Sequence, residues 1–147
     1  MWVFLFNSQA PTETSKRSIV GSVRCVQETQ PYVSFGESDN STSERPQNLL
    51  EAFKNAGVTA NIPANIQAAL WAKLALMAVN SGIGAITRVP TGQWRSVAGS
   101  WKMAQQVAQE VLAVAAGKGI VMPSDSLAST VARLEASAPN STSSMQR

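Results

Sequence analysis

The chain has 147 residues, which is enough for one domain with a hydrophobic core. Its formal charge of +3 is mild and its twelve Lys and Arg residues are scattered, so it lacks the basic stripe typical of nucleic-acid binding. Histidine is absent, which excludes Ser-His-Asp and Cys-His catalysis and most zinc sites. With one cysteine, Cys25, the chain forms no internal disulfide, which favours the cytoplasm.

The first third of the chain predicts a short stretch of β structure. Residues 1–18 read as an irregular start with an apolar tip. Two β-like runs follow, one over residues 19–26 and one in YVSFG, and a turn is expected in QETQP between them. A lone hairpin is barely stable in water, yet no further strand is expected elsewhere in the sequence.

Helices are predicted from QNLLEAFKNAG onward. Ser41 or Ser43 is expected to cap the first helix and Gly57 to end it. A long apolar helix should run from Ile66 to about Arg88, because the residue before Pro90 avoids helical backbone angles. No run is expected to reach membrane-spanning length.

The segment TGQWRSVAGSWKMAQQVAQEVLAVAAGKG predicts one further helix with an apolar stripe toward a core. The stripe consists of Trp94, Val97, Trp101, Ala104, Ala108, Val111, Leu112 and Ala115. A last short helix, capped by Ser124, precedes the tail APNSTSSMQR.

A single charge, Lys73, stands in the apolar run ALWAKLALMAVNSGIGAI. On a helix, Asn80 lies about 20° from Lys73 and Gly84 about 20° to the other side, with Ser81 at about 80°. An ammonium, an amide and a bare backbone patch therefore share one stripe, and Lys73 and Asn80 are about 10 Å apart along the axis. The helix propensity lost at Gly82 and Gly84 would be explained by close approach of another group.

Two readings of Lys73 remain open from the residues alone. Lysines on amphipathic helices usually extend to water, whereas the neighbours on this side (Ala69, Leu70 and Leu76) are apolar. The glycines of SGIGAIT do not indicate a dinucleotide site, because Thr87 replaces the third glycine and the motif sits inside a helix.

The run LWAKLALMAVNSGIGAIT followed by PNSTSSMQ resembles the C-terminal domain of ketopantoate reductase (2-dehydropantoate 2-reductase). The segments SFGE and SERPQNLLEAFKNAGV resemble that family's link out of its nucleotide-binding domain, so the similarity covers roughly Val23 to the C-terminus. It implies a mainly α fold of the 6-phosphogluconate-dehydrogenase-like type, preceded by a β remnant of a Rossmann domain. The implied division is 1–40 for the irregular start and β remnant, and 41–147 for the helical domain, truncated at its end.

The resemblance also implies a reaction, the NADPH-dependent reduction of 2-dehydropantoate to pantoate in pantothenate biosynthesis. Lys73 matches the family's catalytic lysine, which gives a proton to the keto oxygen. The family's two helix asparagines fall on Met77 and Ser81, and Asn80 is expected to take over from Met77 in binding substrate. Ser143 and Ser144 match the substrate-binding serines; without the resemblance, they read as a solvated tail.

Two departures from the family lead us to expect a fragment. The glycine-rich nucleotide fingerprint is missing, and the family's acidic residue after SSM would lie beyond Arg147. The isolated chain is therefore expected to be inactive. Two alternatives remain: a non-catalytic helical interaction or oligomerisation module, for which a homodimer is one form, and a reductase of another 2-oxo acid or an imine. The expected partner is a small 2-oxo acid rather than nucleic acid, a metal or a membrane.

Overall fold

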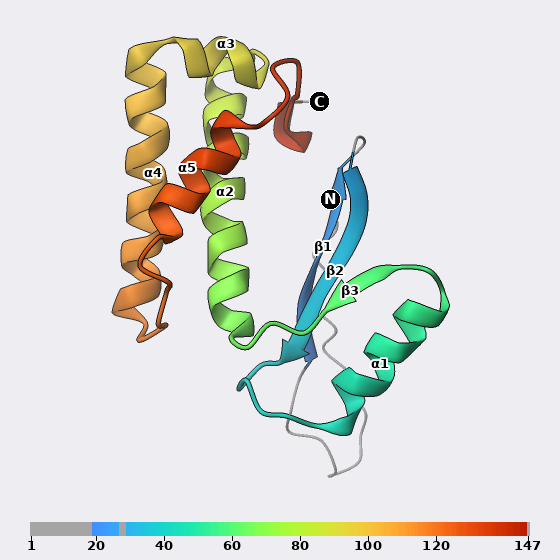
Figure 1. Cartoon of the computed structure of the whole chain (residues 1–147). Coiled ribbons are helices and arrows are strands. Elements are labelled where there is room, and N and C mark those ends of the chain that lie inside the picture. Colours follow the sequence, from blue (N-terminus) through green and yellow to red (C-terminus); the bar gives the residue numbers. More distant parts are fainter. Residues whose placement is uncertain (1–18, 27–28, 147) are drawn as a thin grey trace. The chain divides into compact units, whose positions relative to one another are not determined.

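The computed structural model describes residues 19–26 and 29–146 (Figure 1). The chain forms two compact units, residues 1–70 and 71–147. The predicted irregular start at 1–18 lies outside the described residues, as does part of the predicted QETQP turn. The side chains of residues 19–31 and of Ser144 also lie outside them.

The first unit contains a three-stranded sheet in the order β1-β2-β3. Strand β1 (Ile19–Val26) pairs antiparallel with β2 (Thr29–Glu37), with Val23 opposite Val33. Strand β3 (Thr59–Asn61) pairs parallel with β2, so the expectation of no further strand is wrong. The three residues of β3 are too few to show the alternation of apolar and polar side chains that predicts a strand. They form a strand only because they pair with β2.

Helix α1 (Glu44–Asn55) supplies the crossover between β2 and β3 that a parallel pair requires (Figure 1). It starts three residues before the predicted segment. Phe53 of α1 packs on Phe35 of β2, with ring centroids 5.6 Å apart. Gly57 ends the helix as predicted, in the left-handed conformation (φ +71°) that glycine adopts without a steric cost.

The long apolar helix is α2 (Ile66–Thr87), close to its predicted bounds. The helix predicted over the following segment is instead two helices, α3 (Thr91–Ser96) and α4 (Ala98–Gly117). The break falls at Val97, whose backbone is extended and whose side chain is 55% exposed rather than in the core stripe. Helix α5 (Ser126–Glu135) begins after Asp125 rather than after the predicted cap Ser124, and a short 3-10 turn, η1 (Ser144–Gln146), follows.

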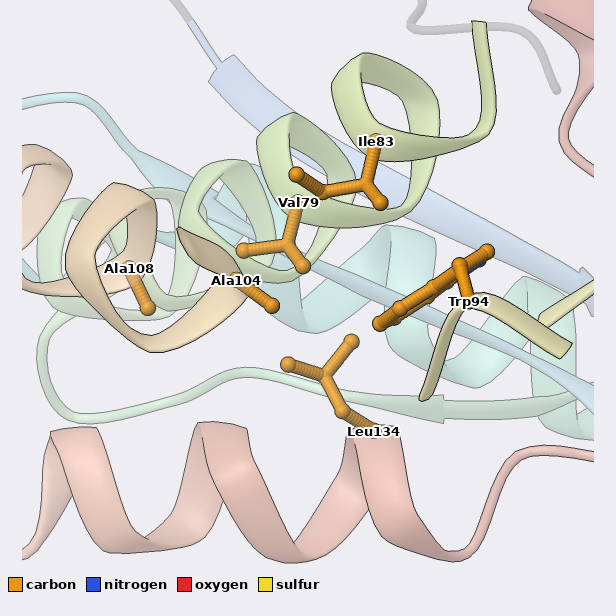
Figure 2. Packing of buried hydrophobic residues seen from close by; sticks show 6 residues of the cluster. All are labelled: Val79, Ile83, Trp94, Ala104, Ala108 and Leu134. Carbon is orange, nitrogen blue, oxygen red and sulfur yellow. The ribbon is translucent and has the colours of Figure 1, made fainter. Parts of the chain in front are cut away.

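Four helices share the core of the second unit, and Figure 2 shows their side chains converging. The cluster consists of Val79 and Ile83 from α2, Trp94 from α3, Ala104 and Ala108 from α4, and Leu134 from α5. Alanines on α4 let its backbone approach the other helices closely. Trp101 of α4 stacks on Trp94 with centroids 6.4 Å apart, which adds a favourable aromatic contact to the burial.

Helix α2 is long and apolar enough to cross a membrane by length and composition alone, with 22 residues and a mean hydropathy of 1.4. The expectation that no run reaches this length is therefore wrong. A core helix of a soluble protein meets the same criterion, and Val79 and Ile83 of α2 are buried in the helical core.

Candidate functional site

The candidate site is built on α2, which carries three of the predicted residues. Lys73, Asn80 and Ser81 are all half-buried. The helix is regular from Ile66 to Thr87, so the predicted spacing holds: Lys73 and Asn80 lie on one stripe, about two turns apart.

The side-chain oxygen of Asn80 is buried in an unusual way. Its Oδ1 is buried and accepts no hydrogen bond within the described residues. Burying a polar oxygen without a partner costs about 1–3 kcal/mol, and such atoms in folded proteins call for an explanation, an unseen water or ligand among them. A hydrogen-bond donor on a bound molecule is one such explanation.

The C-terminal segment is not a solvated tail, because backbone hydrogen bonds hold it to the start of α3. The Thr91 N–H donates to the Ser141 carbonyl at 2.9 Å, and the Gly92 N–H donates to the Pro139 carbonyl at 2.8 Å. The Thr91 hydroxyl donates to the Ser141 carbonyl as well, at 3.1 Å. These bonds connect residues about 50 positions apart and place the tail beside the C-terminal end of α2.

Gln146 fixes the last turn of this segment. Its Oε1 accepts a hydrogen bond from the Ser143 N–H at 2.7 Å, and its Nε2 donates to the Val89 carbonyl at 2.9 Å. One amide side chain therefore connects the turn that carries Ser143 with the backbone just after α2.

Gly84 is the point of α2 that the turn approaches. A Cβ atom there would lie 2.5 Å from Gln146 Oε1 and 3.2 Å from Ser143 Oγ. The predicted close approach is thus confirmed for Gly84, which is buried. At Gly82 an added Cβ would meet no atom of the described residues within 4 Å, so there the expectation stays a prediction.

Ser143 carries a second buried oxygen, Oγ, without a hydrogen-bond partner in the described chain. Because Ser143 lies against Gly84, one helical turn beyond Asn80, the fold brings two predicted residues from distant parts of the sequence to one end of the α2 stripe. An amide and a hydroxyl together can bind the hydroxyl, carbonyl or carboxylate oxygens of a small acid. The Ser144 side chain is outside the described residues, so its role stays a prediction.

Sequence reasoning missed two contributors, Gln146 and Thr91. The available signal for Gln146 was its place three residues after Ser143, a spacing at which a side chain can reach back to a backbone N–H in a turn. Thr91 gave no such signal, because its partner Ser141 is 50 residues away.

Other classes of site receive no support within the described residues. No group of three or more His, Cys, Asp or Glu residues that could hold a metal ion occurs there. Gly82 and Gly84 lie inside α2, away from any strand-to-helix turn that could hold a pyrophosphate.

A family model described as ketopantoate reductase PanE/ApbA C terminal matches residues 65–147. No curated protein sequence matches the chain. Among solved structures, 2-dehydropantoate 2-reductase from Methylococcus capsulatus is 22% identical with a TM-score of 0.74, over 88% of this chain and 44% of that one. The enzyme from Geobacter metallireducens GS-15 is 20% identical with a TM-score of 0.75, over 87% and 46%.

A further structural neighbour is D-mandelate dehydrogenase, solved with NADH and anilino(oxo)acetate. It is 15% identical with a TM-score of 0.71, over 88% of this chain and 55% of that one. The chain thus spans about half the length of these structures, and identities this low show a shared fold.

The predicted mainly α, 6-phosphogluconate-dehydrogenase-like fold is confirmed. With more than half of its residues matched, the chain belongs to the ketopantoate reductase C-terminal domain family.

Proposed function

We propose that this chain supplies the substrate-binding, proton-donating part of an NADPH-dependent reductase of a 2-oxo acid, with ketopantoate as the first candidate substrate. The proposal depends on two buried oxygens, Asn80 Oδ1 and Ser143 Oγ, that have no hydrogen-bond partner in the described part of the chain. They belong to residues at one end of the stripe that Lys73 shares. Family membership supports the same reading.

The chemistry follows from the residue types. Reduction of a ketone to an alcohol adds a hydride to carbon and a proton to oxygen, and negative charge develops on that oxygen. The Lys73 ammonium would stabilise this charge and deliver the proton. Asn80 and Ser143, with Ser81 and Ser144, would hold the hydroxyl and carboxylate so that the keto oxygen faces Lys73.

The described residues do not form a dinucleotide site, so we assign NADPH to none of them. The cofactor would supply the hydride and would be held by polypeptide outside the described residues. We propose that the β segment within residues 1–40 belongs to that nucleotide-binding domain and that residues 41–147 form the substrate domain. Cytoplasmic location and a homodimer remain parts of this proposal, and light scattering after size exclusion tests the second.

Ligand binding tests the site without any cofactor. Ketopantoate and pantoate are titrated into the 15N-labelled chain, and we expect saturable shifts of amides in residues 73–84 and 141–146. Lys73→Ala should weaken pantoate binding at least tenfold, whereas the matched control Lys102→Ala, an exposed lysine of α4, should leave it unchanged. Absence of shifts at both segments would contradict the proposal and favour the non-catalytic helical module.

A second substrate class is favoured by one structural neighbour, D-mandelate dehydrogenase, whose structure holds an anilino(oxo)acetate. A parallel titration with an aryl 2-oxo acid separates the two classes. Tighter binding of the aryl acid than of ketopantoate would reassign the substrate and keep the role of Lys73, because the pocket lining sets specificity while the lysine serves the shared ketone.

A further inference from the structure

A polar pocket lies within the first unit, independent of the candidate site on α2. Its volume is about 220 Å³, and its walls are the end of β2, the loop into α1, the first turn of α1 and residues 62–66. Glu37, the last residue of β2, lines this pocket and is only 2% exposed. A buried glutamate needs compensation, because desolvation of a carboxylate is costly.

The hydrogen bonds of Glu37 leave half of its carboxylate without a partner. Oε1 accepts a bond from the Ser43 hydroxyl at 2.5 Å, while Oε2 is buried with no partner in the described chain. The Ser43 hydroxyl is consequently not used to cap α1, although Ser43 occupies the cap position. Ser41 adds a second buried oxygen without a partner, its Oγ, to the same lining.

The loop that leads from β2 into α1 is held in place by two hydrogen bonds from the start of α2. Asn40 Oδ1 accepts a hydrogen bond from the Ile66 N–H at 2.8 Å, and the Ser38 carbonyl accepts one from Gln67 Nε2 at 2.8 Å. Asn40 has a positive φ of 60°, a conformation that asparagine tolerates better than most residues. The pocket wall is therefore fixed by specific contacts with the start of α2.

Among the described residues that line the pocket, Glu37 is the only one with an ionisable side chain, and no Lys, Arg or His occurs. Pro46 and Pro63 also line the pocket and have no N–H to offer. A cationic donor would satisfy the open oxygen of Glu37 and also offset the charge of its carboxylate. A metal ion fits less well, because no cluster of three metal-binding side chains occurs among the described residues, and the space is larger than one ion needs.

We propose that this pocket binds a small organic primary ammonium, with N–H groups donated to Glu37 Oε2 and Ser41 Oγ. Hydrogen bonds between an ammonium and a carboxylate are charge-assisted and roughly twice as strong as those between neutral groups. The proposal concerns residues 36–66 and does not depend on the reductase function.

The probes are ethylammonium and ethanolammonium chloride, titrated into the 15N-labelled 147-residue chain at constant ionic strength. We expect saturable amide shifts confined to residues 36–47 and 62–66. Tetramethylammonium, which has the charge without an N–H, should produce at least tenfold weaker shifts at the same concentration. Equal shifts with tetramethylammonium, or none with either amine, would overturn the proposal, as would saturable binding of Na⁺, K⁺ or Mg²⁺ in place of the amines.

Two matched variants assign the site. Glu37→Gln keeps an acceptor for the Ser43 hydroxyl and removes the charge, so amine binding should be lost. Glu44→Gln, an exposed carboxylate in the adjacent turn of α1, should bind like the unmodified chain. If Glu37→Gln fails to fold, Ser41→Ala takes its place, with at least tenfold weaker binding expected. Unchanged amine affinity in a folded Glu37→Gln or Ser41→Ala variant would show that the amine does not bind at these oxygens.

Discussion

Asn80 and Ser143 bring two buried oxygens, neither with a hydrogen-bond partner among the described residues, to the same end of α2. Each costs about 1–3 kcal/mol unless something unseen satisfies it, a large share of the stability of a small domain. A bound acid with hydroxyl and carboxylate groups would satisfy both. Ser143 reaches this position because Gly84 has no side chain and leaves room for the turn that carries it. At the residue scale, the site therefore depends on Gly84.

Gly84→Ala tests this dependence. The new Cβ would lie 2.5 Å from Gln146 Oε1, the mobile end of a side chain, so the turn should shift rather than the helix unfold. We expect at least tenfold weaker pantoate binding with the free energy of unfolding changed by less than about 1 kcal/mol, since alanine also raises helix propensity. Binding is followed by NMR titration and stability by urea denaturation.

Gly82→Ala is the matched control for this variant. It adds the same methyl group to the same helix where nothing lies within 4 Å. Stability should rise by up to about 1 kcal/mol while pantoate binding stays unchanged. Equal binding by the two alanine variants would show that the approach of the turn to Gly84 has no part in the site.

A second residue-scale prediction concerns the role of Lys73 in turnover. When the chain is joined to a dinucleotide-binding domain that makes it active, Lys73→Ala should lower kcat by about 10²–10⁴-fold, the usual contribution of a positioned acid. NADPH oxidation at saturating ketopantoate measures this. Unchanged turnover would remove Lys73 from the chemistry, and Lys102→Ala again serves as the control.

At the scale of elements, the C-terminal turn η1 and the start of α3 behave as one assembly. Thr91 and Gly92 hold residues 139–141, and Gln146 holds Ser143. A Cβ at Gly92 would lie 2.8 Å from Pro139 Cβ, so this contact also requires glycine. The position of Ser143 is thus set by elements that lie 50 residues earlier in the chain.

Gln146→Ala should release this turn. The variant loses two hydrogen bonds, each worth about 1 kcal/mol, and exposes the Ser143 N–H. We expect hydrogen exchange of the Ser143 amide to accelerate at least tenfold and pantoate binding to weaken, with the helices intact by circular dichroism. Met145→Ala, in the same turn but 66% exposed, should change neither quantity; the same acceleration there would mean that the turn is held by something other than Gln146.

At the scale of the second unit, one core joins α2, α3, α4 and α5 (Figure 2). Leu134 is fully buried in it. Arg95 of α3 donates hydrogen bonds to the carbonyls of Leu134 and Glu135 at the end of α5, both at 2.8 Å, where the last helical carbonyls need partners outside the helix. The helix that carries Lys73 is therefore stabilised by residues that take no part in the site.

Leu134→Ala should lower the free energy of unfolding by about 2–5 kcal/mol, because it opens a cavity where four helices meet. Val114→Ala is the surface control, at 53% exposure on α4, and should change stability by about 0.5 kcal/mol or less. Urea denaturation measures both. Similar values for the two variants would contradict the described core.

For the 147-residue chain as a whole, we expect no measurable NADPH-dependent reduction of ketopantoate, because the described residues form no dinucleotide site. The control is the same chain joined to such a domain, which should gain activity. Robust turnover by the 147 residues alone would contradict this expectation.

The sequence by itself determined the mainly α class, the bounds of α2 and the stop at Gly57, because hydrophobic periodicity, proline and glycine act locally. It also predicted that Lys73, Asn80 and Gly84 share a stripe, since helix geometry alone decides this. Strand β3 and the anchoring of the tail by Thr91 and Gln146 were decided by the tertiary structure. Each depends on a partner far away in the chain, and a local pattern carries no information about such a partner.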